Sequence, residues 1–105
     1  MKANDLDNIV RNNLSTVLDA MEMQHGLSAE YPATVMSFLE QMSQIREYIS
    51  VAGEYGLAYE CIVANLESIP YVLSGLQAIK LLEVGLLMGF KTESPDDVVF
   101  DRRNP

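Results

Sequence analysis

The residues that could support chemistry are few. Glu22-Met23-Gln24-His25 forms a Glu-x-x-His step, the half-motif with which di-iron helix bundles place two ligands on one side of a helix. A complete site needs a second such step and two further glutamates, but His25 is the single histidine of the chain. We therefore expect no metal site, and we expect His25 to interact with the last carbonyl groups of a helix.

Cys61 is the other candidate, because a thiolate beside His25 could act as a nucleophile. It falls on an apolar arc with Leu57 and Ile62, where a thiol packs as a small hydrophobic group. The six glycines follow no phosphate-binding spacing, and no pair of carboxylates marks an active site. The sequence predicts neither an enzyme nor a bound cofactor.

Charge is the strongest signal in the composition. Fifteen Asp or Glu residues against seven Lys or Arg give the 105-residue chain a formal net charge of −8. That balance disfavours binding to nucleic acid phosphates and favours a basic protein partner. One cysteine allows no internal disulfide, and the N-terminus is charged where a signal peptide would be apolar. We expect a cytoplasmic protein that binds neither nucleic acid nor membranes directly.

Apolar residues at steps of three and four predict four helices, at about residues 4–25, 32–52, 54–68 and 74–88. The residues expected at helix starts are Pro32 and Ser74, and those expected at or just past helix ends are Gly26, Gly53, Pro70 and Gly89. Four helices with short connections pack most simply as an antiparallel bundle. The prediction is an all-α fold: an antiparallel four-helix bundle domain at 1–90 with a short C-terminal extended tail at 91–105.

Each predicted helix has one apolar stripe that should face the core. The stripes are Leu6, Val10, Leu14, Val17, Leu18 and Met21; Val35, Phe38, Leu39, Met42, Ile45 and Ile49; Tyr55, Ala58, Ile62 and Leu66; and Leu76, Ala78, Ile79, Leu82 and Leu86. In the fourth helix, Gln77, Lys80 and Glu83 are expected to face solvent. Leu87 falls on the same polar stripe and is expected to be exposed with them.

In an antiparallel bundle, the end of the first helix shares a pole with the start of the second and the end of the third. The acidic residues at this pole are Asp19, Glu22, Glu30 and Glu67. The topology places no Lys or Arg beside them, because Arg46 is expected at the opposite pole. An acidic surface without cations repels itself and attracts a basic protein.

Two tyrosines flank the acidic pole. Tyr31 precedes Pro32 and Tyr71 follows Pro70, and tyrosine often anchors protein interfaces. Glu40 is predicted to be a secondary contact. The alternative is that both tyrosines cover the end of the bundle and that the charges form an ordinary solvated surface.

Gly53-Glu54-Tyr55-Gly56-Leu57-Ala58-Tyr59-Glu60, followed by Leu87-Met88-Gly89-Phe90, resembles the small all-helical immunity proteins of bacterial polymorphic toxin systems. These include Maf-type immunity proteins and those of contact-dependent growth inhibition. The resemblance covers roughly residues 35–90. It implies binding and neutralisation of a cognate toxin domain, commonly a nuclease, in the cytoplasm. The matched residues look like determinants of the fold, so they do not locate the contact surface.

The charge argument agrees with this resemblance, because a nuclease that attracts phosphate has a basic cleft. We predict an immunity protein, or antitoxin, for a basic nuclease such as an RNase. The predicted toxin-binding residues are Asp19, Glu22, Glu30, Tyr31, Glu40, Glu67 and Tyr71. A small acidic adaptor or chaperone for a basic endogenous protein remains the alternative, and the sequence leaves the oligomeric state open.

Overall fold

The protein is all-helical over the residues that its computed structural model describes, which are 3–32 and 36–89. Four α-helices, α1 (Ala3–Glu22), α2 (Phe38–Glu47), α3 (Tyr55–Ser68) and α4 (Gly75–Met88), are joined by a 3₁₀-helix, η1 (His25–Glu30), and a π-helical turn, η2 (Tyr48–Ala52). The predicted all-α class is confirmed. The predicted tail at 91–105 lies outside the described residues.

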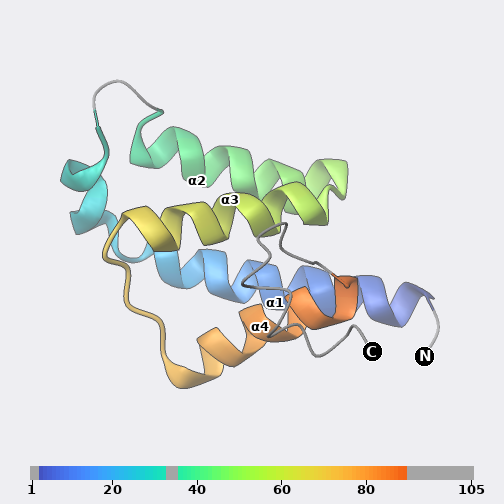
Figure 1. The fold of residues 1–105 in the computed structure, drawn as a ribbon. Helices are drawn as coiled ribbons and strands as arrows, with labels where there is room; N and C mark the ends of the chain where they lie inside the picture. Colours follow the sequence, from blue (N-terminus) through green and yellow to red (C-terminus); the bar gives the residue numbers. More distant parts are fainter. Residues whose placement is uncertain (1–2, 33–35, 90–105) are drawn as a thin grey trace, which may run out of the picture.

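The helix α1 organises the packing. It contacts all three other α-helices, and its contact with α4 is the most extensive between any two of them. In Figure 1, α2 and α3 lie on one side of α1 and α4 lies on the other. The helix α4 therefore depends mainly on α1 for its position, since it touches α3 over a much smaller region.

Local signals account for several helix ends. The Ser74 hydroxyl accepts a hydrogen bond from the backbone N–H of Gln77, and the Gln77 side chain accepts one from the backbone of Ser74, so the predicted start of α4 is confirmed as a capping box. Gly53 and Gly89 follow η2 and α4 with φ angles of 64° and 67°. This left-handed conformation favours glycine, and both predicted stops are confirmed.

The start of the second helix and the end of the first were predicted wrongly. Ser37 caps α2, because its hydroxyl accepts a hydrogen bond from the backbone N–H of Glu40, and the helix begins six residues after Pro32. Gly26 lies within η1 instead of ending α1. The Gln24 side chain accounts for the break. Its amide nitrogen donates to the carbonyls of Ala20 and Val72, and its amide oxygen accepts a hydrogen bond from the Val72 N–H.

The core is built from the predicted apolar stripes of α1, α2 and α3. Its fully buried members include Leu14, Leu18, Met21, Ile45, Ile49, Ala58 and Ile62. Tyr55 packs against this cluster, as predicted. Leu39 was placed in the core by its spacing, but 75% of its surface is exposed; it lies in the first turn of α2, beside the capped N-terminus. Val35 lies outside the described residues.

The predicted orientation of α4 is wrong. Its predicted inner residues, Leu76, Ala78, Ile79, Leu82 and Leu86, are all exposed. The buried residues are Val84 and Gly85, and Leu81 and Met88 pack against the core together with Leu87, which had been expected in solvent. The reason is that α4 carries two apolar stripes, and the period of a helix does not say which stripe meets α1.

Candidate protein-binding surface

The acidic residues predicted to form one pole come from segments that meet at one end of the molecule. In Figure 1, the end of α1, η1, the start of α2 and the end of α3 all lie at the left-hand end. Glu30 belongs to η1 and Glu67 to the last turn of α3, and both are exposed. Glu40 is exposed in the first turn of α2, where its carboxylate accepts a hydrogen bond from the Ser37 hydroxyl at 3.1 Å.

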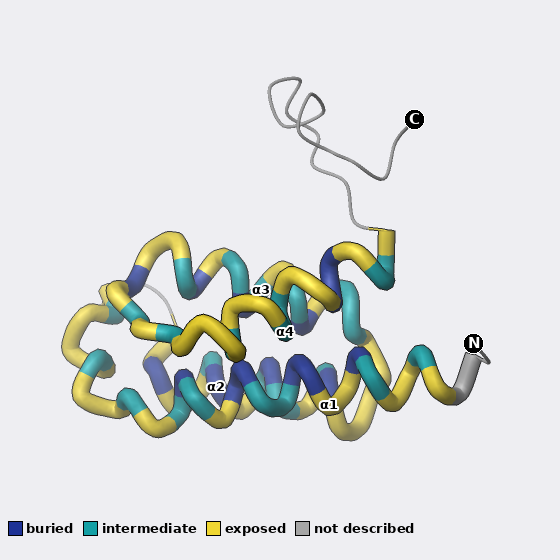
Figure 2. The backbone as a smooth tube through the Cα atoms, turned by 90° about the horizontal axis from the view of Figure 1, so that it is seen from below, coloured by how far each residue is buried: buried dark blue, intermediate teal, exposed yellow. Residues whose placement is uncertain are grey.

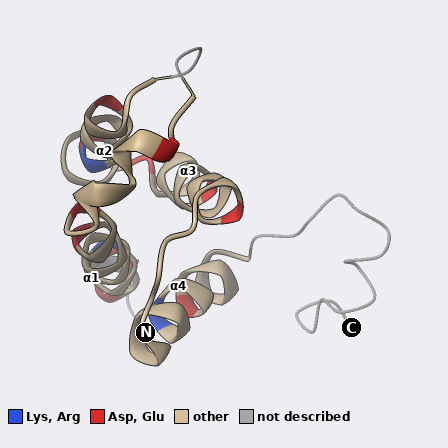
Figure 3. Ribbon diagram, turned by 90° about the vertical axis from the view of Figure 1, so that its left-hand side faces the viewer, with Lys and Arg blue, Asp and Glu red and all other residues tan. Residues whose placement is uncertain are grey.

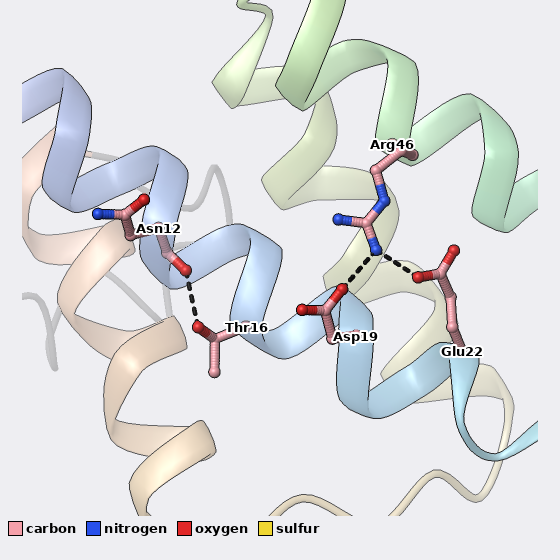
Figure 4. Close-up of polar contacts among 5 residues, drawn as sticks. All are labelled: Asn12, Thr16, Asp19, Glu22 and Arg46. Carbon is pink, nitrogen blue, oxygen red and sulfur yellow. Dashed lines mark hydrogen bonds and ion pairs between the residues drawn. The ribbon is translucent and has the colours of Figure 1, made fainter.

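The expectation that this surface holds no cation is wrong. Arg46 of α2 forms ion pairs with Asp19, at 2.6 Å between Nη2 and Oδ1, and with Glu22. Figure 4 shows the guanidinium lying between the two carboxylates of α1. Partial burial opposes the charge of Arg46, but the two carboxylates outweigh it, so the pKa of Arg46 is raised.

The position of Arg46 follows from the late start of α2. With the helix beginning at Phe38, Arg46 is only its ninth residue, whereas a helix starting at Pro32 would have carried it farther along the bundle. The long arginine side chain covers the remaining distance. Asp19 and Glu22 therefore share one cation, which compensates half of their charge, and Glu30 and Glu67 have no ion-pair partner among the described residues.

Tyr31 and Tyr71 are hydrogen-bonded to each other through their hydroxyls. The Tyr31 hydroxyl donates to Oδ1 of the buried Asn65 at 2.6 Å, so the Tyr71 hydroxyl is the donor to Tyr31. The Asn65 amide in turn donates to the Gln41 side chain at 3.0 Å and to the Cys61 carbonyl at 2.8 Å. This chain of hydrogen bonds ties together the residue that follows η1, α2, α3 and the segment before α4.

The tyrosine pair serves the fold. Both rings pack against the core, and the Tyr31 ring meets Phe38 edge-on, with a centroid separation of 5.8 Å. Burial raises the pKa of both tyrosines, and the hydrogen bond donated to Tyr31 raises that of Tyr71 further. This arrangement favours the interpretation that they cover the end of the helices, and both rings remain partly exposed.

The helical part carries the net negative charge of the chain, and it carries most of it on its surface. Residues 3–89 contain eleven Asp or Glu side chains and three Lys or Arg, so they carry the whole net charge of −8. Ten of the eleven acidic residues are exposed and Glu22 is half-buried. Figure 3 looks onto the end described above and shows acidic segments on several helices with few basic ones.

The candidates for chemistry that the sequence offered are His25 and Cys61, and both lie among the described residues. They include no group of three His, Cys, Asp or Glu side chains able to hold a metal ion. His25 lies in η1 and, with Asp19, Glu22 and Met23, lines a shallow open depression. The half-buried Cys61 thiol has a raised pKa, caused first by burial and then by the charge of Glu60, and a raised pKa makes a thiol a poorer nucleophile at neutral pH.

Sequence reasoning missed an exposed apolar face of α4. Four large side chains on the outer face of α4 are more than half exposed: Leu76, Ile79, Leu82 and Leu86. The signal was present in the sequence as a second apolar stripe, with Leu81, Val84 and Met88 forming the first. Only the contact with α1 distinguishes the two stripes.

No family model, no curated protein and no solved structure matches the chain. No described helix combines the length and the apolar character needed to cross a lipid bilayer.

Proposed function

We propose that this protein is an immunity protein that binds and neutralises a basic toxin domain, such as a ribonuclease of a contact-dependent or related polymorphic toxin system. The proposal keeps two predictions from the sequence. The four helices form an antiparallel bundle followed by a C-terminal extended tail, and the protein acts in the cytoplasm. The observation that supports it best is the exposed and largely unpaired negative charge of the helical part.

That charge is suited to recognition of a nuclease. Only Asp19 and Glu22 are in ion pairs among the described residues, and the remaining acidic side chains produce a field that attracts a basic surface. A nuclease cleft is basic because it must hold phosphates. An acidic domain competes for the same cleft, and long-range attraction speeds the encounter.

Within the predicted contact residues, we take Glu30 and Glu67 as the best candidates for a test. Both are exposed, lie on segments at the same end of the molecule and are not engaged by a cation. Asp19 and Glu22 are less suitable for a test, because reversing their charge would also break the Arg46 pairs. Tyr31, Glu40 and Tyr71 complete the proposed surface from the neighbouring segments.

The function is tested by expressing, inside cells, a toxin domain encoded beside the gene for this chain. We expect the toxin to stop growth and co-expression of this chain to restore it, with a 1:1 complex recovered from the rescued cells. Failure to rescue or bind that toxin would contradict the proposed function. A stable complex with a basic endogenous protein in its place would favour the adaptor alternative.

The surface is tested separately from the function. Glu30→Gln with Glu67→Gln should slow association with the toxin several-fold at about 50 mM NaCl, and the effect should shrink near 500 mM, where charges are screened. Glu47→Gln with Glu54→Gln is the matched control, since both residues are exposed and flank η2, away from η1, and the change in net charge is the same. Equal slowing by both pairs would remove this end of the molecule from the interface while leaving the function intact.

A further inference from the structure

The outer face of α4 carries a stripe of large apolar side chains. These side chains follow one another at steps of three and four residues, so they line one side of the helix. Their exposed fractions are 64% for Leu76, 63% for Ile79, 60% for Leu82 and 52% for Leu86. Figure 2 shows this side of α4 as largely exposed. The stripe thus has the composition of a buried helix face, although each of its members is more than half exposed.

Such a stripe is unusual on a helix at a protein surface. A surface helix normally has charged and polar residues opposite its buried side, and contiguous exposed apolar patches mark sites where another segment or molecule packs. Burying these side chains would remove apolar area from water, which favours association. The stripe is therefore suited to an apolar occupant.

The chain continues from α4 into a segment that contains such an occupant. Residues 90–105 lie outside the described residues, and their sequence has one run of three apolar residues, Val98-Val99-Phe100. Charged residues stand directly before and after this run, at 96–97 and at 101–103. Valine and phenylalanine are enriched in extended segments that bury one side, so the run is suited to an apolar surface.

We propose that residues 98–100 pack as an extended segment on the outer face of α4, with Val98 and Phe100 against the apolar stripe. The occupant of the stripe is then a part of the same chain. This contact goes beyond the proposed function, because it forms without a toxin.

The length of the connection permits this contact. Gly89 ends α4 in the left-handed conformation, with φ at 67°, so the chain leaves the helix axis there. Eight residues, 90–97, separate Gly89 from Val98, and they span up to about 26–29 Å when extended. The far end of the stripe, at Leu76, is about 20 Å from Gly89 at 1.5 Å per residue. The apolar run can therefore reach any part of the stripe.

The spacing of the apolar run also suits the stripe. In an extended segment, alternate side chains lie on one side, about 6.6–6.8 Å apart. Neighbouring side chains along a helix stripe are separated by about one turn, or 5.4 Å. Val98 and Phe100 can thus contact two successive members of the stripe, such as Leu82 and Leu86, while Val99 lies on the opposite side of the segment.

The covalent link favours this segment over a separate molecule. A segment tethered by a short linker has an effective concentration in the millimolar range, which a second copy or another protein does not reach in solution. Two copies with a net charge of −8 each also repel each other. The exposed Glu83 carboxylate lies on α4 beside the stripe, and Arg102 and Arg103 follow the apolar run closely. The segment therefore brings cations toward this carboxylate, whereas a second copy would bring another Glu83.

The test is the rate at which a thiol on the stripe reacts with iodoacetamide in the full chain. Leu82→Cys places the thiol on the stripe, and Leu39→Cys is the matched control, because both leucines are exposed and each precedes a glutamate. Each variant also carries Cys61→Ala, so that one thiol remains. We expect Leu82→Cys to react about tenfold more slowly than Leu39→Cys, as for a stripe that is uncovered about a tenth of the time. Rates in urea correct for intrinsic reactivity, and circular dichroism verifies the helix content.

A second pair of substitutions identifies the segment that protects the thiol. Adding Phe100→Asp to Leu82→Cys should raise the reaction rate to that of Leu39→Cys, because a carboxylate does not pack on the stripe. Val99→Asp is the matched control, since it changes the charge equally but lies on the opposite side of the extended segment. This variant should keep most of the protection.

Several outcomes would overturn the proposal. Equal rates for Leu82→Cys and Leu39→Cys would show that the stripe is uncovered, and protection that survives Phe100→Asp would show that another group covers it. Protection that grows between about 5 and about 200 µM protein would assign the stripe to a second copy. Protection that appears only after a toxin is added would assign it to the toxin, and would leave the proposed function intact.

Discussion

Asn13 of α1 donates from one amide nitrogen to the carboxylate of Glu83, at 2.6 Å, and to the carbonyl of Lys80, at 3.1 Å, both in α4. Asn13 is only 4% exposed, so this amide would lack partners if α4 were turned about its axis. The contact thus selects which of the two apolar stripes of α4 faces α1.

We expect Asn13→Ala to destabilise the protein by about 1–3 kcal/mol, because it removes a charge-assisted hydrogen bond and leaves the Lys80 carbonyl without this donor. Urea unfolding followed by circular dichroism measures the change. The neighbouring Asn12 is exposed, and Asn12→Ala should change stability by less than about 0.5 kcal/mol. Equal effects of the two substitutions would show that the contact does not hold α4.

The chain of hydrogen bonds at the tyrosine pair predicts an order of effects. Tyr31→Phe removes the donor to the buried Asn65 and the acceptor of Tyr71 together, so it should cost about 1–3 kcal/mol. Tyr71→Phe should cost less, because Tyr31 still donates to Asn65. Tyr48→Phe, at a half-buried tyrosine outside this chain, is the control and should be nearly neutral. Denaturant midpoints that reverse this order would contradict the assigned donors.

The same pair predicts a dependence on alkaline pH. Burial raises the pKa of Tyr31 and Tyr71 in the folded protein, whereas unfolded tyrosines lose their proton near about pH 10. Above that pH the unfolded state binds fewer protons than the folded state, so the free energy of unfolding falls as pH rises. The loss should be smaller in Tyr71→Phe than in the wild type. Urea midpoints between about pH 8 and pH 11 measure it, and parallel curves would contradict the shift of Tyr71.

The Tyr59 side chain of α3 lies close to Gly85 of α4. A Cβ atom added there would lie 2.8 Å from the Tyr59 hydroxyl oxygen, whereas one added at Gly75 would meet nothing within 4 Å. We expect Gly85→Ala to destabilise by about 1–3 kcal/mol despite the better helix propensity of alanine. Gly75→Ala should be neutral or stabilising by up to about 1 kcal/mol. Thermal or urea unfolding that shows both variants alike would mean that Tyr59 moves aside freely.

The sequence anticipated α1 well because α1 has a single apolar stripe. Val10, Leu14 and Leu18 follow the helical period, their opposite face is polar, and all three are buried. The two ends of α4 were equally predictable. A capping side chain at Ser74 starts the helix and a left-handed glycine at Gly89 ends it, both by local chemistry alone. The candidate site was harder to predict from the sequence, because the pairing of its charges depends on which segments meet in the fold.

What the sequence determined by itself was the helical class, the net charge of −8 and the parts of the core whose apolar residues leave no choice of face. The tertiary structure decided the orientation of α4 and the pairing of Arg46 with Asp19 and Glu22. The physical reason is the range of the forces involved: periodicity and capping act within a few residues, whereas a helix with two apolar faces and a long cationic side chain find their partners only across the fold.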